Sequence, residues 1–356
     1  ITLPIGISFF TFQGISYVID VYRGQGEALK NPLDVGLYLA FFPQLIAGPI
    51  VRYQTVAKEI QGRRENLTDF ADGVRLFVIG LAKKVLLANN FALIADKAFG
   101  LETPYLSVSF AWLGAIAYTM QIYFDFGGYS DMAIGLGRMF GFHFLPNFRY
   151  PYIARSITDF WRRWHISLSS WFRDYVYIPL GGSRVNRKWK LVRNLLIVWA
   201  CTGFWHGANW TFLVWGLYYF CFLCIEKLTG LNKKLERIPV FSNVVVLLIV
   251  VVGWVIFRAD TLTAALDYLS VMFGLTGNAL VSDMGIFYWC ENRILVFIGL
   301  ACCLPWREWL QRLYRKSPRL PQWFAKGGKG FLQIGATAAL AVILVTSVSF
   351  LVKGGY

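Results

Sequence analysis

Three long uncharged apolar runs constrain the fold of this chain more than any other feature. Residues 331–352 contain 22 residues without a charge, residues 241–257 contain 17 and end at Arg258, and residues 106–124 form a third run. A helix that crosses a membrane needs roughly 20 apolar residues. Long uninterrupted runs favour helices over a β-barrel, whose strands alternate over about 10 residues. The sequence therefore predicts an all-α, polytopic integral membrane protein.

The composition supports this class. Charged residues make up 15% of the chain and apolar residues 56%, whereas soluble proteins carry about 25% charged residues. The net charge is +15, which in a soluble protein would suggest nucleic-acid binding. In a membrane protein it indicates Lys and Arg collected in cytoplasmic loops. We therefore expect membrane lipids, and no nucleic acid, as partners.

No boundary in the sequence separates off a soluble domain, so residues 1–356 are predicted to form a single membrane-embedded domain. Residues 41–50, FFPQLIAGPI, carry two prolines and a glycine. They predict broken or re-entrant helices, which a membrane tolerates only where protein covers the freed backbone. The chain begins ITLPIGISFF, without Met or a signal-peptide n-region. We interpret this as a removed N-terminus or a fragment.

The most basic stretch is residues 149–193, with ten Lys or Arg against two acidic residues, Asp159 and Asp174. Within it, apolar and aromatic residues recur at steps of three and four from Ile157 to Phe172. This spacing is typical of one face of an amphipathic helix. An aromatic face flanked by arginines suits a helix that lies in the membrane interface. We therefore predict a basic cytoplasmic or interfacial segment that contains one such helix.

An uncharged run of 32 residues follows at 194–225. It is too long for one untilted span and too short for two complete ones. Gly203 and Gly207 lie near its middle, so we predict a break, or a hairpin-like pair of short helices, around residues 203–210. His206 falls in this break, roughly 20 Å of helical rise beyond the last basic residue. That distance predicts that His206 lies deep in the membrane.

An ionisable side chain at membrane depth is a functional candidate by default. A histidine can remain neutral there and still take a proton, so His206 is a candidate general base. Its neighbouring glycines let the backbone turn and a substrate approach closely. Asn209 could orient the imidazole or a substrate oxygen, although packing or a helix N-cap is its more ordinary role. The alternative for His206 is a structural hydrogen bond to a neighbouring helix.

The other two histidines have different expected roles. His165, in DFWRRWHISLSSW, lies on or beside the aromatic face and is the second candidate, with an interface position as the alternative. His143, in GFHFLPNF, is expected to be structural. The three histidines are 22 and 41 residues apart, which matches no compact ligand motif, so we expect no metal site. The CFLC motif, Cys221 to Cys224, is interpreted as helix packing rather than a redox or metal pair.

Two further features suggest charge pairing and phosphate binding. Asp125 and Asp131 lie within or beside apolar segments, and such carboxylates usually pair with a cation or line a path. Arg138 is a candidate partner for Asp131. Residues 178–188, IPLGGSRVNRK, place a Gly-Gly turn beside basic residues. This turn could cradle a phosphate such as that of coenzyme A, or be a plain cytoplasmic turn.

Acyl transfer by a covalent serine intermediate is not indicated, because no GxSxG elbow is present. Direct attack by an acceptor hydroxyl is simpler. A histidine would remove the hydroxyl proton, and backbone N–H groups or an Asn would hold the developing oxyanion.

Five blocks occur in consistent order from about residue 3 to residue 260. They are LPIGISFFTFQGISYVIDVYRG (3–24), YFDFGGYSDMAIGLGRMFGF (123–142), NFRYPYIARSITDFWRRWHISLSSWFRDYVYIPLGGSR (147–184), FWHGANWTFLVWGLYY (204–219) and VIFRAD (255–260). Together they resemble the membrane-bound O-acyltransferase (MBOAT) family, most closely its bacterial branch, which includes the alginate O-acetylation proteins. The third block is highly specific, and only the C-terminal third of the chain is generic.

The resemblance implies a multi-helix bundle that encloses a funnel or tunnel. A cytoplasmic acyl donor would enter from one side and an extracytoplasmic hydroxyl acceptor from the other. It implies that His206 is catalytic and that His165 is a second functional position. Neighbours of these histidines form the predicted substrate-binding set: Asn209, Asp159, Trp205 and Arg162. The chain departs from the family by lacking the N-terminal helices that usually precede the LPIGISF block.

The sequence and the resemblance together predict an O-acetyltransferase of the bacterial cytoplasmic (inner) membrane. It would move an acetyl group from acetyl-CoA or another acyl thioester, with no tightly bound cofactor, towards hydroxyls of an extracytoplasmic polysaccharide. Periplasmic or extracellular acetylation proteins are the expected protein partners. Two alternatives remain open. One is D-alanyl transfer to teichoic acid from a carrier-protein thioester, and the other is a channel or transporter with His206 as a gate or proton relay.

Overall fold

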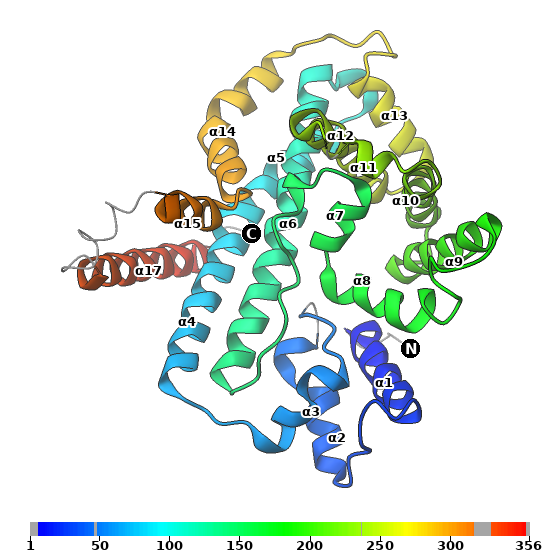
Figure 1. Ribbon diagram of the computed structural model, residues 1–356. Helices are drawn as coiled ribbons and strands as arrows, with labels where there is room; N and C mark the ends of the chain where they lie inside the picture. The colour runs from blue at the N-terminus through cyan, green and yellow to red at the C-terminus, as the bar shows by residue number, and fades with distance from the viewer. Residues whose placement is uncertain (1–5, 46–47, 236, 317–328, 354–356) are drawn as a thin grey trace, which may run out of the picture.

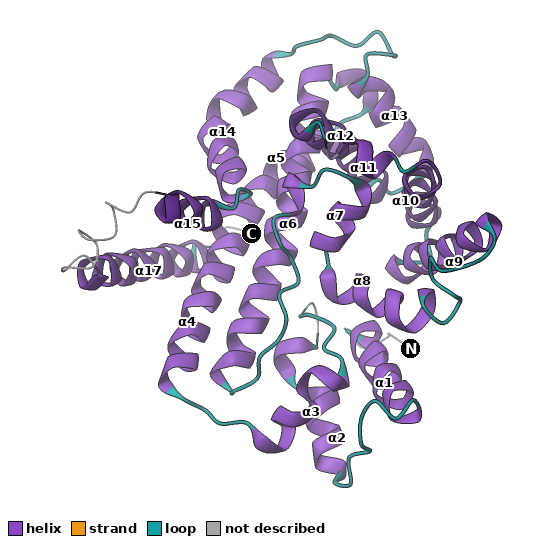
Figure 2. Ribbon diagram, in the orientation of Figure 1, coloured by secondary structure: helices purple, strands orange, loops and turns teal. Residues whose placement is uncertain are grey.

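The computed structural model describes residues 6–45, 48–235, 237–316 and 329–353. These residues form helices and connecting loops, with no β-strand among them (Figures 1 and 2). The α-helices are α1 (Ile7–Tyr22), α2 (Pro32–Ala40), α3 (Tyr53–Gly62), α4 (Leu67–Ala82), α5 (Asn89–Phe99), α6 (Val108–Met139), α7 (Ile157–Arg163), α8 (Ile166–Phe172), α9 (Lys188–His206), α10 (Trp210–Thr229), α11 (Leu231–Leu235), α12 (Pro239–Arg258), α13 (Leu262–Met272), α14 (Asp283–Cys302), α15 (Trp306–Lys316) and α17 (Lys329–Val352).

Five helices in the described part of the chain are long and apolar enough to cross a membrane. They are Leu67–Phe99, Trp210–Thr229, Pro239–Arg258, Asp283–Cys302 and Ile334–Val352. Two of them contain most of the runs predicted at 241–257 and 331–352. The prediction of an all-α, polytopic membrane protein is confirmed.

The third predicted span was wrong in its bounds. We expected a span at residues 106–124, whereas the structure has one helix of 32 residues, Val108–Met139. The glycines of DFGGYSD do not break this helix. One of them, Gly128, lies on the face that packs against α4, where its lack of a side chain lets the two helices approach closely.

Four glycines form the contact between α4 and α6, which lie side by side in Figure 1. Gly73 and Gly80 of α4 face Gly135 and Gly128 of α6, and we call these four the glycine seam. A Cβ atom at Gly73 would lie 2.6 Å from the carbonyl oxygen of Gly135, and one at Gly80 would lie 2.5 Å from that of Gly128. Small residues allow this close approach in membrane helices, where dispersion contacts drive packing.

Two ion pairs join the same helices beside the seam. Lys83 Nζ lies 2.6 Å from Asp131 Oδ2, and Lys84 Nζ lies 2.6 Å from Asp125 Oδ1. Both lysines begin a π-helical turn, Lys83–Ala88 (η2), between α4 and α5. Asp125 and Asp131 thus pair with cations as predicted, but the proposed Asp131–Arg138 pair was wrong. Asp131 and Arg138 are seven residues apart on the same helix, which separates their backbones by roughly 10 Å of rise.

Arg138 instead reaches the start of α4. Its Nε lies 3.0 Å from Asp69 Oδ1 and its Nη1 lies 3.4 Å from Asp72 Oδ2. These pairs close the end of the α4–α6 contact opposite to α5.

The N-terminal helices pack through a polar face. Gln13, Ser16 and Asp20 of α1 are buried, and Ser16 Oγ lies 3.2 Å from the hydroxyl of Tyr38 in α2. The predicted irregular stretch at 41–50 contains a single 3₁₀ turn, Phe42–Gln44, after which residues 46 and 47 lie outside the described residues. In the described residues of this stretch the α-helix is broken after Ala40, as the prolines predicted, and a re-entrant form stays a prediction.

Residues 157–172, predicted as one interfacial helix, form two helices, α7 and α8, and their aromatic side chains pack inside the protein. The chain turns between α7 and α8 at His165, whose φ is 44°. The aromatic face is buried in the protein: Phe160 is 0% exposed, Trp164 4% and Trp171 5%. Helical spacing of apolar residues marks an apolar surrounding on one side, and it does not distinguish lipid from a protein core. The prediction of one helix lying against lipid was therefore wrong.

The predicted break in the run 194–225 is confirmed. Helix α9 ends at His206 and α10 begins at Trp210, so the connection falls within the predicted 203–210. The helices are longer than expected because α9 begins at Lys188. Gly203 lies inside α9 rather than in the turn: a Cβ there would lie 2.6 Å from the carbonyl oxygen of Phe212. Gly203 therefore serves the packing of α9 against α10.

Candidate functional site

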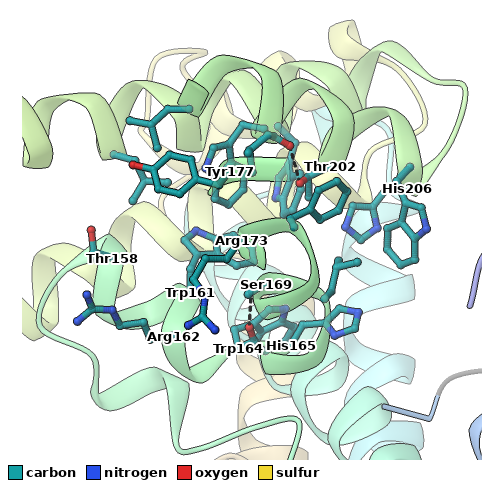
Figure 3. Close-up of a pocket in the computed structure, with 18 of the residues that line it drawn as sticks. Thr158, Trp161, Arg162, Trp164, His165, Ser169, Arg173, Tyr177, Thr202 and His206 are labelled. Carbon is teal, nitrogen blue, oxygen red and sulfur yellow. Dashed lines mark hydrogen bonds between the residues drawn. The ribbon is translucent and has the colours of Figure 1, made fainter. Parts of the chain in front are cut away.

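A cavity of about 490 Å³ lies mainly among α7, α8, α9, α10 and α12, and α1 and α6 also contribute to its lining. Most of its lining is apolar or aromatic, and its polar exceptions are few. The titratable or basic residues that line it are Arg162, His165, Arg173, Tyr177, His206 and Lys227. An apolar cavity with a few convergent polar groups is the usual form of a small-molecule site. Figure 3 shows the two histidines at one end of this cavity and Thr158 with Arg162 at the other.

His206 is the last residue of α9 and lies against a set of aromatic rings. Its ring centroid is 4.7 Å from that of Trp205, 5.0 Å from that of Trp215 and 5.1 Å from that of Phe257, each in an edge-on arrangement. Within the described residues, no hydrogen bond engages its ring nitrogens. The imidazole is therefore held by packing, and its nitrogens are available to a bound molecule.

His165 is held by hydrogen bonds instead. It is 3% exposed, its Nδ1 lies 3.2 Å from Asn147 Oδ1, and the ring of Phe126 packs edge-on with centroids 4.6 Å apart. Its Nε2 is buried with no hydrogen-bond partner among the described residues. His165 is also one of the residues that line the cavity.

Trp205 lies between the two histidines. Its ring centroid is 4.7 Å from that of His206 and 6.2 Å from that of His165. On its other side it packs against Phe9 and Phe12 of α1, with centroids 5.8 and 5.9 Å apart. The indole thus contacts both imidazoles and connects the histidine end of the cavity to α1.

The other end of the cavity is basic and depends on a buried carboxylate. Glu226 of α10 is 3% exposed and accepts hydrogen bonds from the N–H of Ile157 at 2.6 Å and from the N–H and hydroxyl of Thr158 at 2.9 and 2.7 Å. These are unpaired donors at the first turn of α7. A negative group is also favoured there by the helix dipole. Glu226 therefore fixes the helix that presents Arg162.

Two members of the predicted substrate-binding set have structural partners and do not line the cavity. Asp159 pairs with Arg163, its Oδ1 lying 2.9 Å from the Nε. Asn209 caps α10, accepting from the N–H of Thr211 at 3.2 Å, and its amide donates to the carbonyl of Asp260 at 2.9 Å. Of the predicted residues, His206, His165, Trp205 and Arg162 line one cavity, with Arg162 at the end away from the histidines (Figure 3). Asp159 lies on α7, and Asn209 in the turn before α10.

Features that sequence patterns singled out elsewhere have other surroundings. His143 lies outside the cavity, with its Nδ1 2.8 Å from Glu59 Oε1 and its Nε2 3.4 Å from Asp69 Oδ2. The amides of Gly181 and Gly182 donate to backbone carbonyls of residues 178 and 177. Both amides are therefore engaged within the turn itself, which favours the plain turn that the sequence also allowed over a phosphate cradle.

The described part of the chain contains neither a disulfide nor a cluster of side chains that could bind a metal ion. Its six cysteines are free thiols, and no group of three His, Cys, Asp or Glu side chains gathers there as a metal site would need. Cys221 and Cys224 lie on successive turns of α10.

Sequence patterns missed Asn147 and Glu226. Asn147 lies in the loop after α6 and Glu226 near the end of α10. Both are buried polar residues, yet each meets the site only through contacts distant in sequence.

Comparison with known proteins places the cavity in a shared region. Residues 28–263 match the family model described as MBOAT, membrane-bound O-acyltransferase family, and every cavity-lining residue except Phe9 lies within this range. The chain is 50% identical over 273 residues to "Probable alginate O-acetylase AlgI" of Pseudomonas syringae pv. tomato, covering 77% of this chain and 52% of the relative.

More distant relatives carry other names. A "Peptidoglycan O-acetyltransferase" of Helicobacter pylori is 40% identical over 308 residues, covering 78% of this chain and 58% of the relative. A "Teichoic acid D-alanyltransferase" of Bacillus subtilis is 31% identical over 252 residues, covering 66% and 62%. The chain spans about half the length of the relatives with the alginate name.

Proposed function

Because the chain belongs to the membrane-bound O-acyltransferase family, we propose that it is the catalytic part of a membrane O-acetyltransferase that acts on a polysaccharide. The names of the relatives at 50% and 40% identity refer to O-acetyl transfer, whereas D-alanyl transfer is named at 31%. This difference favours acetyl over D-alanyl as the group transferred.

The observation that carries this proposal is the pair of histidines in an aromatic cavity. An ester forms when an acceptor hydroxyl attacks the carbonyl of an acyl thioester. His206 takes the hydroxyl proton as the new C–O bond forms. The tetrahedral intermediate then expels the thiol, whose sulfur receives the proton from the imidazolium as the C–S bond breaks. The aromatic walls exclude water, which would otherwise hydrolyse the thioester.

The donor in this proposal is acetyl-CoA or another acyl thioester, used as a substrate rather than as a resident cofactor. Arg162, Arg173 and Lys227 line the cavity, and Arg162 lies at the end away from the histidines (Figure 3). Guanidinium and ammonium groups suit the phosphates that such donors carry. The apolar stretch between them and the histidines would hold the uncharged arm of the thioester.

We place the protein in the bacterial cytoplasmic membrane, with the basic segment 149–193 facing the cytoplasm, because Lys and Arg concentrate on that side. The acceptor would then approach from the opposite side, where periplasmic or extracellular acetylation proteins would receive or present the polymer. A channel is less well supported, since an ion or water path needs polar lining groups or backbone carbonyls, and this cavity is lined mainly by aromatic rings.

A comparison of acyl donors tests the proposal. The full-length protein, reconstituted in nanodiscs with an oligosaccharide acceptor, is offered acetyl-CoA, an acetylated carrier protein or a D-alanylated carrier protein in separate reactions. Mass spectrometry of the oligosaccharide should show a gain of acetyl from one of the first two. Transfer of D-alanine alone would favour the teichoic-acid alternative. Protein-dependent solute flux without any acyl product would contradict the enzyme.

A further inference from the structure

Asn147 makes a hydrogen-bond network with only one consistent orientation. It is 1% exposed, and its Oδ1 accepts from the backbone N–H of Ser167 at 3.2 Å and from the Ser167 hydroxyl at 3.0 Å. Its Nδ2 donates to Ser130 Oγ at 3.0 Å. A backbone N–H can only donate, so the atom that faces Ser167 has to be the amide oxygen.

This orientation determines where His165 carries its proton. His165 Nδ1 lies 3.2 Å from the same Asn147 Oδ1. Because an amide oxygen only accepts, Nδ1 has to donate and therefore bears the hydrogen. In a neutral imidazole the other nitrogen, Nε2, is then an unprotonated acceptor. That Nε2 is buried without a partner among the described residues, and His165 lines the cavity.

Two backbone features hold the ring in this place. His165 has a φ of 44° between α7 and α8, and the N–H of Ile166, next to it, donates to the backbone carbonyl of Asn147 at 2.9 Å. The backbone beside His165 is thereby hydrogen-bonded to Asn147, the same residue whose side chain determines the tautomer of the imidazole. Phe126 closes one side of the ring with centroids 4.6 Å apart.

We propose that Asn147 is a positioning residue that holds His165 as the Nδ1–H tautomer, so that its Nε2 lone pair receives an O–H or N–H of the bound substrate. The inference rests on the proposed function for the nature of that substrate. The tautomer itself follows from the hydrogen bonds and is measurable without any reaction. His206 remains the base, and His165 orients the molecule on which it acts.

The experiment is ¹⁵N NMR of the full-length protein labelled with ¹⁵N-histidine in nanodiscs. The resonances of His165 are identified by their loss in a His165→Gln variant. In the wild-type protein, Nδ1 should be protonated and Nε2 should give an imine-type resonance. An Nε2–H tautomer in the wild type would overturn the proposal.

Substitutions separate positioning from general packing. Asn147→Ala removes the acceptor, and the Ser167 hydroxyl, 3.4 Å from His165 Nδ1, can then donate to that nitrogen. The tautomer should shift towards Nε2–H, and acyl transfer should fall with the fraction of Nδ1–H that remains, by about tenfold when a tenth remains. Asn147→Asp keeps an acceptor and should keep Nδ1–H, which preserves the test if the alanine variant does not fold.

Asn243→Ala is the matched control, because Asn243 is another partly buried Asn whose amide donates to the carbonyls of Tyr152 and Ala154. It should leave the His165 resonances unchanged. An unchanged tautomer in Asn147→Ala would refute the role of Asn147. A shifted tautomer with wild-type acyl transfer would refute the use of Nε2 by the substrate. Wild-type protein without acyl transfer to any acceptor would contradict the proposed function and leave the tautomer result standing.

Discussion

Gly80 of α4 and Gly128 of α6 meet backbone to backbone. A Cβ atom on Gly80 would lie 2.5 Å from the carbonyl oxygen of Gly128, and one on Gly128 would lie 2.6 Å from that of Gly80. Gly73 and Gly135 repeat the contact seven residues away. Helix α6 also supplies Phe126 to the cavity, and so the glycine seam fixes the helix on which one wall of the site depends.

Gly80→Val should therefore destabilise the protein, because the contacting atoms are backbone and cannot move aside. Overpacking of this kind costs about 1–3 kcal/mol, occasionally more. The midpoint of thermal unfolding in detergent measures the effect. Gly36→Ala is the control: Gly36 lies in α2, and a Cβ atom added to it would have nothing within 4 Å. This variant should be as stable as the wild type or slightly more. Equal midpoints for both variants would contradict the seam.

The Lys83–Asp131 pair should show energetic coupling. Lys83→Met leaves Asp131 without its cation, and Asp131→Asn leaves Lys83 without its anion, so each single variant should be less stable than the wild type. The double variant should lose less than the sum of the two, with a coupling of about 0.5–3 kcal/mol. Lys97→Met, at an exposed position of α5, serves as the control and should be additive with Asp131→Asn. Additivity at Lys83 as well would count against the pair.

Glu226→Gln should weaken the basic end of the cavity. The amide has one oxygen where the carboxylate has two, so at least one of the three donors from Ile157 and Thr158 loses its acceptor. A buried donor left unpaired costs about 1–3 kcal/mol. We expect a lower unfolding midpoint and, since α7 carries Arg162, a higher KM for the acyl donor. Glu291→Gln, exposed on α14, should change neither quantity. A wild-type KM in Glu226→Gln would refute the link to Arg162.

His143 should give a small pH dependence of stability. The hydrogen bond to Glu59 raises the pKa of His143 above its ordinary value of 6.5, against an opposing effect of burial, and Asp69 adds to the rise. A group whose pKa is higher in the folded state stabilises it while protonated. The contribution is therefore full below pH 6.5 and is lost as the pH rises through the higher folded-state pKa. The unfolding midpoint of the wild type relative to His143→Gln should fall over that range. A difference independent of pH would contradict the ion pair.

How much the sequence could predict depended on whether the signal was local. The break between α9 and α10 was predictable because a 32-residue uncharged run fits neither one span nor two. His206, the last residue of α9, could be placed next to that break from the spacing alone. The membrane class was likewise evident from run lengths. These inferences need no knowledge of which helix packs against which.

Contacts between distant residues could not be predicted in this way. The spacing from Ile157 to Phe172 gave an apolar face, but the turn at His165 depends on a hydrogen bond from Ile166 to Asn147. The continuous helix through DFGGYSD was not predictable, because Gly128 packs against Gly80, which lies 48 residues earlier in the sequence. Arg138 pairs with Asp69 rather than Asp131 through a contact of the same long-range kind.

The base assignment of His206 is the central claim, and a single substitution tests it most directly. His206→Gln keeps a polar side chain but cannot take a proton, so acyl transfer should fall on the order of 10²–10⁴-fold. The measurement is the O-acetyl content of surface polysaccharide in cells that carry the full-length variant as their only copy. Protein abundance and the unfolding midpoint are measured alongside, with His143→Gln as the control. We predict lost acetylation with normal abundance for His206→Gln and wild-type acetylation for His143→Gln. Wild-type acetylation in His206→Gln would contradict the assignment.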